Sequence, residues 1–271
     1  MSETATVLNP FGTLLQHWRR ARRMSQLSLG LEADVSQRHI SFVESGRAHP
    51  SRDLVLTLAA VLDIPLRERN ALLTAAGYAG AFREPALDAP EMGTVRRALD
   101  LILAKHEPYP AVVLDRHWNV LETNKAAPRF FARFIDLRIQ PQPLNILRAM
   151  FHPNGMRPYV ANWEEVAEAL LQRAHREVLG GMPDDTTAEL IQEVLRYPDV
   201  PPRLRLRALG PMPTPIVPIR FRKGDFAMTY FSAVITLGTP QDVTSQEIRI
   251  ESFFPVDAAT ETQALAMAEG A

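Results

Sequence analysis

The segment Ser25–Gly46 reads SQLSLGLEADVSQRHISFVESG, and its spacing decides the fold of the first part of the chain. Ser25 and Ser36 each precede apolar residues at helical spacing, where a hydroxyl can cap free backbone N–H groups. We therefore expect one short helix that ends near Ala33 and a second that ends before Gly46. The turn Asp34–Ser36 joins them.

Two short helices joined by such a turn have the geometry of a helix-turn-helix, whose second helix enters the DNA major groove. The inward-facing residues are expected to be Leu27, Leu31, Val35, Ile40 and Val43. The remaining side chains of the second helix include types that pair with base edges, and Gln26 can meet a phosphate at the start of the first. The predicted DNA contacts are Gln26, Ser36, Gln37, Arg38, Ser41 and Arg47.

The whole of residues 11–83 shows apolar residues at helical spacing and predicts five helices. Residues 1–83 hold 10 Arg and 7 acidic residues, whereas residues 84–271 hold 20 basic and 24 acidic ones. A basic module on an acidic body favours an anionic partner for the module, although a solvated helix face gives the same pattern. Arginines such as Arg20 and Arg22 are expected to contact phosphates. Residues 84–93, EPALDAPEMG, have the composition of a linker.

The composition limits the kind of protein this chain can be. Its 271 residues suggest about two domains. The absence of cysteine excludes disulfides and thiolate metal sites, and the seven histidines lack metal-binding spacing. We find neither a signal peptide nor an apolar run long enough for a bilayer, and we expect a cytoplasmic protein without a membrane partner. With no convincing nucleophile, metal motif or phosphate-binding loop, we predict no catalytic residues, no metal and no enzyme activity.

Residues 94–258 change to a mixed pattern that predicts two strands, a helical insert and three further strands. We expect a frayed tail over 259–271 and an extended proline-rich loop over 198–218. The expected strands are Pro110–Leu114, Trp118–Glu122, Ile216–Arg222, Phe226–Leu237 and Glu247–Phe254. The expected helices are Val95–Lys105, Lys125–Phe134, Leu144–Met150, Asn162–Leu179 and Asp185–Arg196.

The first region resembles the phage-repressor (Cro/CI, or XRE) helix-turn-helix family. The similarity rests on Arg19, Ser25-Gln26, Leu31, Val35-Ser36, Ile40-Ser41, Glu44, Gly46-Arg47, Pro50-Ser51, Leu54, Leu58 and Leu62. The resemblance implies a structural pair, Arg19 and Glu44, that clamps the first helix to the recognition helix. The alternative is a plain helical bundle.

Residues 94–258 resemble the C-terminal domain of MmyB-like transcriptional regulators. The residues that carry the similarity are 106–127, Asn145–Arg148, His152-Pro153, Asn162-Trp163 and 237–260. The resemblance implies a PAS-like antiparallel sheet with added helices, proposed to bind a small apolar ligand such as a fatty acid. The whole chain would then be a five-helix bundle followed by an α+β domain.

The strand Phe226–Leu237 is mostly apolar on both faces, so we expect both to be covered and a cavity to lie between it and the helices of residues 125–179. Helices, a partner subunit or a ligand could cover them. A buried ligand carboxylate would need a cation, for which Arg148 is the candidate, although a surface arginine fits the same pattern. The predicted ligand contacts are Arg148, Met228, Tyr230, Phe231 and Ala233.

These patterns together favour a transcriptional regulator that binds double-stranded DNA and responds to a small apolar ligand. We expect a homodimer, because one recognition helix reads too few base pairs for useful specificity. The alternative is a DNA-binding protein whose second domain serves only dimerisation or partner docking. An enzyme with a DNA-binding appendage is a third possibility.

Overall fold

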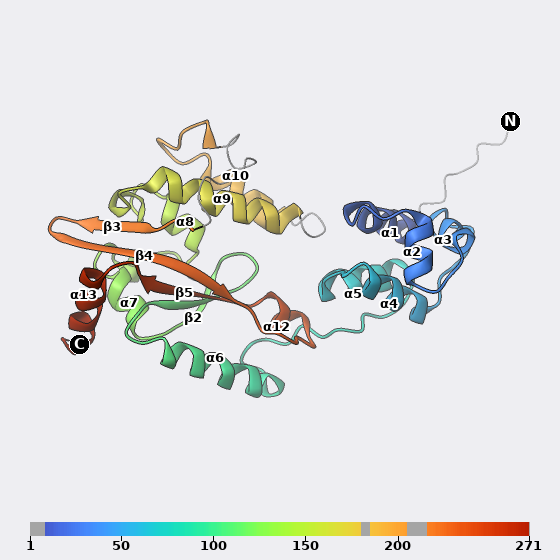
Figure 1. Cartoon of the computed structure of the whole chain (residues 1–271), viewed down its shortest axis with the longest axis horizontal. Helices are drawn as coiled ribbons and strands as arrows, with labels where there is room; N and C mark the ends of the chain where they lie inside the picture. The colour runs from blue at the N-terminus through green and yellow to red at the C-terminus, as the bar shows by residue number, and fades with distance from the viewer. Residues whose placement is uncertain (1–8, 180–184, 205–215, 271) are drawn as a thin grey trace. The chain divides into compact units, whose positions relative to one another are not determined.

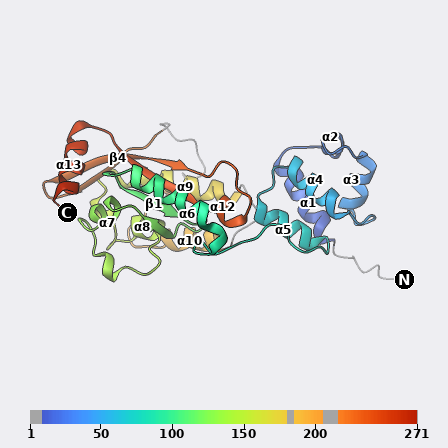
Figure 2. The same cartoon turned by 90° about the horizontal axis from the view of Figure 1, so that it is seen from below.

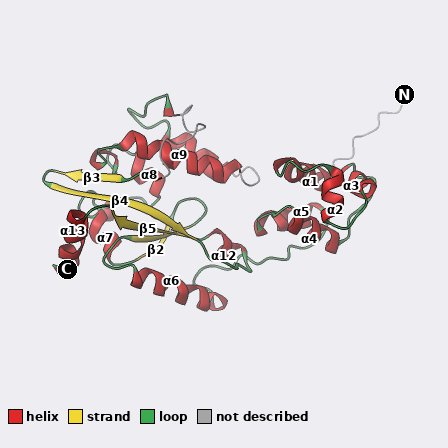
Figure 3. Ribbon diagram, in the orientation of Figure 1, coloured by secondary structure: helices red, strands yellow, loops and turns green. Residues whose placement is uncertain are grey.

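The computed structural model describes residues 9–179, 185–204 and 216–270, which form two compact units (Figure 1). The first unit comprises Met1–Pro85 together with Gln241–Gln246, and the second comprises Ala86–Pro240 with Glu247–Ala271. Helices dominate the first unit, whereas the second combines a sheet with helices (Figure 3). In the described ranges, no helix has both the length and the apolar character needed to cross a membrane.

The described part of the first unit contains the five predicted helices. They are α1 (Pro10–Ala21), α2 (Gln26–Glu32), α3 (Gln37–Glu44), α4 (Arg52–Val61) and α5 (Leu66–Ala75). The hydroxyls of Ser25, Ser36 and Ser51 accept hydrogen bonds from backbone N–H groups in the first turns of α2, α3 and α4. The cap positions that the sequence predicts for these helices are therefore confirmed.

The buried face of α2 differs from the expected one. Leu27 and Leu31 are 52% and 74% exposed, while Leu29 and Gly30 are buried. A Cβ atom on Gly30 would lie 2.6 Å from the carbonyl oxygen of Val35, so α2 meets the turn at a site that only glycine fits. The close approach fixes the rotation of α2 so that Leu29 lies in the core, while Leu27 and Leu31 lie on the surface.

Residues 241–246, in the connection between the fourth and fifth strands of the second unit, belong to the first unit. This connection contains the short helix α12 (Val243–Glu247). Val243 is fully buried, and its backbone N–H donates to the carbonyl oxygen of Arg83 over 2.9 Å. The Thr244 hydroxyl donates to the carbonyl oxygen of Pro85 over 2.6 Å. The predicted boundary at residue 84 therefore leaves out residues 241–246, which also belong to the first unit.

Gln246, in the same connection, caps α5. Its Oε1 accepts a hydrogen bond from the backbone N–H of Leu66 over 2.6 Å, across 180 positions of sequence. Pro65, at the N-cap position itself, makes no side-chain capping bond. A residue from the distant connection thus supplies the acceptor that a serine supplies at α2, α3 and α4.

The second unit is built on an antiparallel sheet of five strands in the order β2-β1-β5-β4-β3. The strands are β1 (Ala111–Leu114), β2 (Val120–Thr123), β3 (Ile219–Lys223), β4 (Phe226–Ile235) and β5 (Arg249–Pro255). All five predicted strands are confirmed, with ends shifted by a few residues. The likeness to a PAS sheet stays a prediction.

Helices cover both faces of this sheet. They are α6 (Gly93–Lys105), α7 (Ala126–Phe131), α8 (Ile146–Phe151), α9 (Trp163–Leu179), α10 (Asp185–Val194) and α13 (Ala258–Glu269). Short 3-10 turns are η1 (Pro90–Met92), η2 (Leu137–Ile139) and η3 (Arg157–Tyr159). On one face, Leu99 and Leu103 of α6 pack against Val113 and Ile250; the larger core lies on the other, under α7 to α10 (Figures 1 and 2).

The second unit differs from the sequence-based expectations at its C-terminal tail and along β4. The expected frayed tail is the ordered helix α13, because Asp257 accepts from the Thr260 N–H over 2.7 Å and Ala264 packs into the core. β4 is left partly uncovered near its two ends: Ala227 is exposed, and Val234 and Ile235 are 42% and 38% exposed. Much of the expected proline-rich loop, residues 205–215, lies outside the described residues.

Candidate functional sites

The outward face of α3 presents the side chains predicted to read DNA. Ile40 and Val43 are buried and fix the rotation of the helix, which leaves Gln37 and Arg38 exposed and Ser41 half-buried. Ser36 is exposed, and its hydroxyl caps the helix by accepting from the His39 N–H over 3.1 Å. Contact of these residues with DNA stays a prediction.

An aromatic ring lies beneath two of the arginines of this surface. The guanidinium carbons of Arg38 and Arg47 lie 5.1 and 5.8 Å from the centre of the half-buried Phe42 ring. Gly46, with φ of +74°, reverses the chain so that the Arg47 N–H donates to the Phe42 carbonyl oxygen over 2.8 Å. The ring therefore restricts both guanidinium groups to one side of α3.

Arg19 and Glu44 form the pair that the resemblance implies. Arg19 Nε and Nη2 donate to the two Glu44 oxygens over 2.6 and 2.9 Å, and the Glu44 side chain is 2% exposed. Hydrogen bonding to Glu44 raises the pKa of Arg19 against the opposing effect of burial. Gln26 also donates its amide to Glu44 over 2.8 Å, so a structural partner holds this predicted phosphate contact.

Arg22 does not match its expected role. Its Nε and Nη2 donate to the carbonyl oxygens of Leu62 and Asp63 over 2.8 Å each, at the end of α4. These bonds satisfy carbonyls that a helix end leaves without partners. The guanidinium of Arg22 is therefore hydrogen-bonded within the first unit. Arg20, in contrast, is exposed.

The five predicted ligand contacts do not come together in one place. Arg148 pairs with Glu193 of α10, with Nη2 and Oε2 2.8 Å apart and side chains that are 46% and 39% exposed. This hydrogen bonding lowers the pKa of Glu193. Arg148 therefore lies in a partly exposed ion pair, and it is not among the residues that line the apolar cavity described below.

The four predicted contacts on β4 divide between the two faces of the sheet. Met228 and Tyr230 are fully buried in the larger core, where burial raises the pKa of Tyr230. Phe231 and Ala233 lie on the opposite face, where Phe231 stacks on Phe254 at 5.3 Å between ring centres. Strand alternation alone excludes a single site made of all four.

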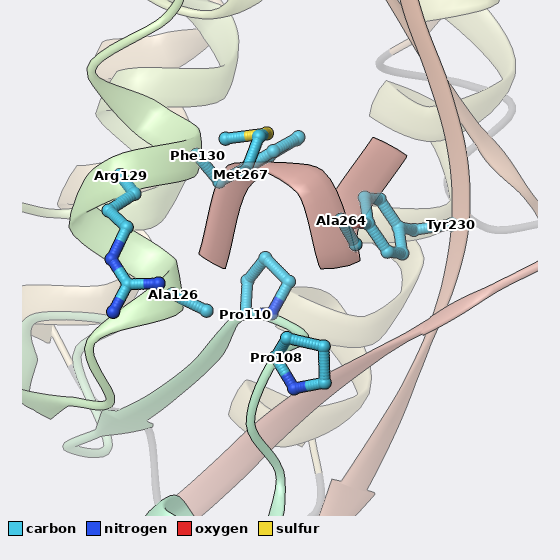
Figure 4. Close-up of a pocket in the computed structure, with 8 residues that line it drawn as sticks. All are labelled: Pro108, Pro110, Ala126, Arg129, Phe130, Tyr230, Ala264 and Met267. Atoms are coloured by element: carbon cyan, nitrogen blue, oxygen red, sulfur yellow. The ribbon is translucent and has the colours of Figure 1, made fainter. Parts of the chain in front are cut away.

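A small hollow adjoins Tyr230 where α7 meets α13 (Figure 4). Its volume of about 10 Å³ is at the lower limit for one water molecule. Its lining is Pro108, Pro110, Ala126, Arg129, Phe130, Tyr230, Ala264 and Met267. The hollow is too small for a ligand.

A second, more apolar cavity lies between the sheet and helices α7, α8 and α9. Its volume of about 30 Å³ accommodates roughly two water molecules. Its lining is Phe131, Ile135, Leu144, Ile146, Ala149, Met150, Met156, Leu170, Ile219, Phe221, Glu251 and Phe253. The cavity lies under the predicted helices, but β3 and β5 line it in place of β4. The sequence pattern missed Glu251, an acidic residue within an apolar strand.

Comparisons with known proteins agree with this division of the chain. Residues 95–266 match the model of the MmyB-like transcription regulator ligand binding domain, and residues 15–69 match a helix-turn-helix model. The uncharacterized HTH-type transcriptional regulator RghRB of Bacillus subtilis (strain 168) is 36% identical over 85 residues. That alignment covers 31% of this chain and 59% of the relative, so the chain spans about three fifths of that protein.

A solved structure, titled as that of an RNA-binding Light-Oxygen-Voltage Receptor, aligns with 99% of this chain and 66% of its own, at 13% identity and a TM-score of 0.27. This likeness is too weak to imply a shared fold. The family models cover both units, and the larger match spans more than half of the chain. The chain therefore belongs to the MmyB-like transcription regulators, with a helix-turn-helix region followed by the ligand-binding domain of that family.

Proposed function

We propose that this regulator binds a specific DNA sequence through α3 and that a small apolar ligand in the second unit controls this binding. The observation that carries the DNA-binding part is the exposed, N-capped α3, with Gln37 and Arg38 outward. The buried Arg19–Glu44 pair holds this helix to α1. A fixed recognition helix is what base readout in the major groove requires.

Each group on this surface has a distinct role in the proposal. Arg38 donates to guanine and Gln37 pairs with adenine, because these side chains match those base edges. Exposed arginines such as Arg20 attract phosphates without regard to sequence, so their contribution falls as salt rises. The ring of Phe42 limits the directions that Arg38 can take.

We further propose a homodimer. Two copies of α3 on one twofold axis would read half-sites about 34 Å apart, or one helical turn of DNA. The second unit offers exposed apolar side chains for such contact, among them Val234 and Ile235 at the end of β4. Scattering that stays at monomer size at micromolar concentration, with protection of one half-site, would refute this proposal.

The ligand part of the proposal rests on the apolar cavity below β3 and β5. A fatty-acid-like molecule needs more room than about 30 Å³, so the cavity has to enlarge when it binds. Met150 and Met156 line it, and flexible thioether side chains can be displaced at modest cost. Regulation also requires that the ligand favour one state of the protein over another.

The small cavity also favours a second candidate function. In this alternative the second unit only dimerises or docks a partner protein, and no ligand is involved. Native mass spectrometry of protein purified from its host, followed by lipid extraction, separates the two. A bound apolar molecule that leaves on extraction supports the ligand-controlled regulator, whereas a mass that protein chains account for in full, with no extractable small molecule, supports the alternative.

The DNA-binding function is tested by selecting duplexes from a random library with the full chain. We expect one enriched motif with two similar halves. Arg38→Ala should lose preference at one base pair in each half, while Arg20→Ala should keep the motif and weaken binding generally. Selection of no motif by the wild-type protein would refute sequence-specific binding.

A further inference from the structure

Glu251 gives the apolar cavity one polar end. It is the single ionisable residue among those that line the cavity, and it is 5% exposed. It lies on β5 and faces α9, where Arg173 reaches it. A buried carboxylate in an otherwise apolar lining is costly unless it has partners, so its surroundings indicate what this end of the cavity accepts.

Two donors hold the carboxylate in place. Ser232 Oγ donates to Glu251 Oε1 over 2.8 Å, and Arg173 Nη1 donates to Oε2 over 3.1 Å. The other terminal nitrogen of the same guanidinium, Arg173 Nη2, is buried and has no hydrogen-bond partner among the described residues. Among the residues that line the cavity, the polar side chain is therefore Glu251, whose oxygens accept hydrogen bonds.

The charges around this end are already balanced. Arg173 also donates through Nε to Glu177 over 3.2 Å, and Arg249 pairs with Glu177 as well. Two arginines thus face two carboxylates. A ligand carboxylate placed here would add an uncompensated negative charge beside Glu251, and both burial and the like charge oppose that.

We propose that this end of the cavity binds a neutral polar group that donates a hydrogen bond, such as the hydroxyl or primary amide of an aliphatic molecule. The O–H or N–H would donate to an oxygen of Glu251. The inference rests on the proposed ligand-binding function and replaces the free fatty acid expected from the sequence with its alcohol or amide.

The test compares three ligands of equal chain length on the full-length protein: 1-decanol, decanamide and decanoate. Binding is measured by calorimetry at neutral pH, where decanoate is ionised. We expect the alcohol and the amide to bind roughly tenfold tighter than decanoate or better, because only decanoate brings a second negative charge. Decanoate that binds as tightly as the other two would overturn the head-group proposal and leave ligand binding intact. Failure of all three to bind would overturn both.

Two variants locate the source of the discrimination. Glu251→Gln keeps the shape and removes the negative charge, so decanoate should gain affinity relative to decanol. Glu91→Gln makes the same change at an exposed residue of η1 that is not among those lining the cavity, so discrimination should persist in this control. Unchanged discrimination in a folded Glu251→Gln protein would refute the role of Glu251. If that variant does not fold, the wild-type comparison decides the proposal.

Discussion

Replacing Gln246 by Ala should loosen α5 selectively. The substitution removes the oxygen that accepts the Leu66 N–H over 2.6 Å, and Leu66 is only 6% exposed. Pro65 cannot replace the cap, because its ring carries no hydrogen-bonding group. Loss of a helix N-cap costs about 0.5–2 kcal/mol. A buried unsatisfied N–H costs about 1–3 kcal/mol. These two figures describe the same loss, so we expect about 1–2 kcal/mol.

Hydrogen exchange of the full-length protein measures this loss where it occurs. About 1.4 kcal/mol corresponds to tenfold faster exchange, which we expect for amides in the first turns of α5. Peptides from the sheet should not change. Gln246→Glu keeps the acceptor and adds a negative charge at the helix N-terminus, so it should restore protection. Gln263→Ala, in α13, is the matched control. Unchanged α5 exchange in Gln246→Ala would show that the distant connection does not stabilise the first unit.

The remaining predictions concern the first unit. Removing Arg19 or Glu44 alone should destabilise the protein by about 3–5 kcal/mol, more than removing both, because the remaining charge stays buried without its counter-charge. Additive losses in a double-mutant cycle of unfolding free energies would contradict this. Arg38→Ala should weaken DNA binding by about 1–3 kcal/mol and relax one base position, as read from a selection experiment. Arg20→Ala should lower the slope of log affinity against log salt by about 1 in a titration series. Arg22→Ala should instead destabilise the first unit in thermal unfolding and leave that salt slope unchanged, since its guanidinium is bonded to the end of α4.

Local signals in the sequence predict most of the elements. The serines at 25, 36 and 51 mark helix starts because each supplies its own cap within three residues. The strands follow from short apolar runs bounded by turns. The rotation of α2 could not be predicted in this way, because two sets of leucines have helical spacing. The contact of Gly30 with the turn decides between them, and that contact is tertiary.

The side chains whose roles the sequence did not reveal have one feature in common. Each has a partner that is distant in sequence. Arg148 lies within an apolar stretch, but Glu193 reaches it from another helix. Gln246 caps a helix that begins 180 positions earlier. Glu251 stands in an apolar strand, and its donors come from β4 and α9. No pattern within one segment reveals such pairs, so the exposed face of α3 was predicted in outline and the polar end of the cavity was missed.

The most direct test of ligand control is the affinity of the full chain for its selected duplex, measured by fluorescence anisotropy at fixed salt with and without saturating 1-decanol. Coupling between two sites is typically worth about 1–3 kcal/mol, so the affinity should change by roughly five- to 150-fold. We expect such a change in the wild-type protein. An affinity that stays the same while calorimetry shows the alcohol bound would contradict it, since a ligand with equal affinity for both states shifts neither.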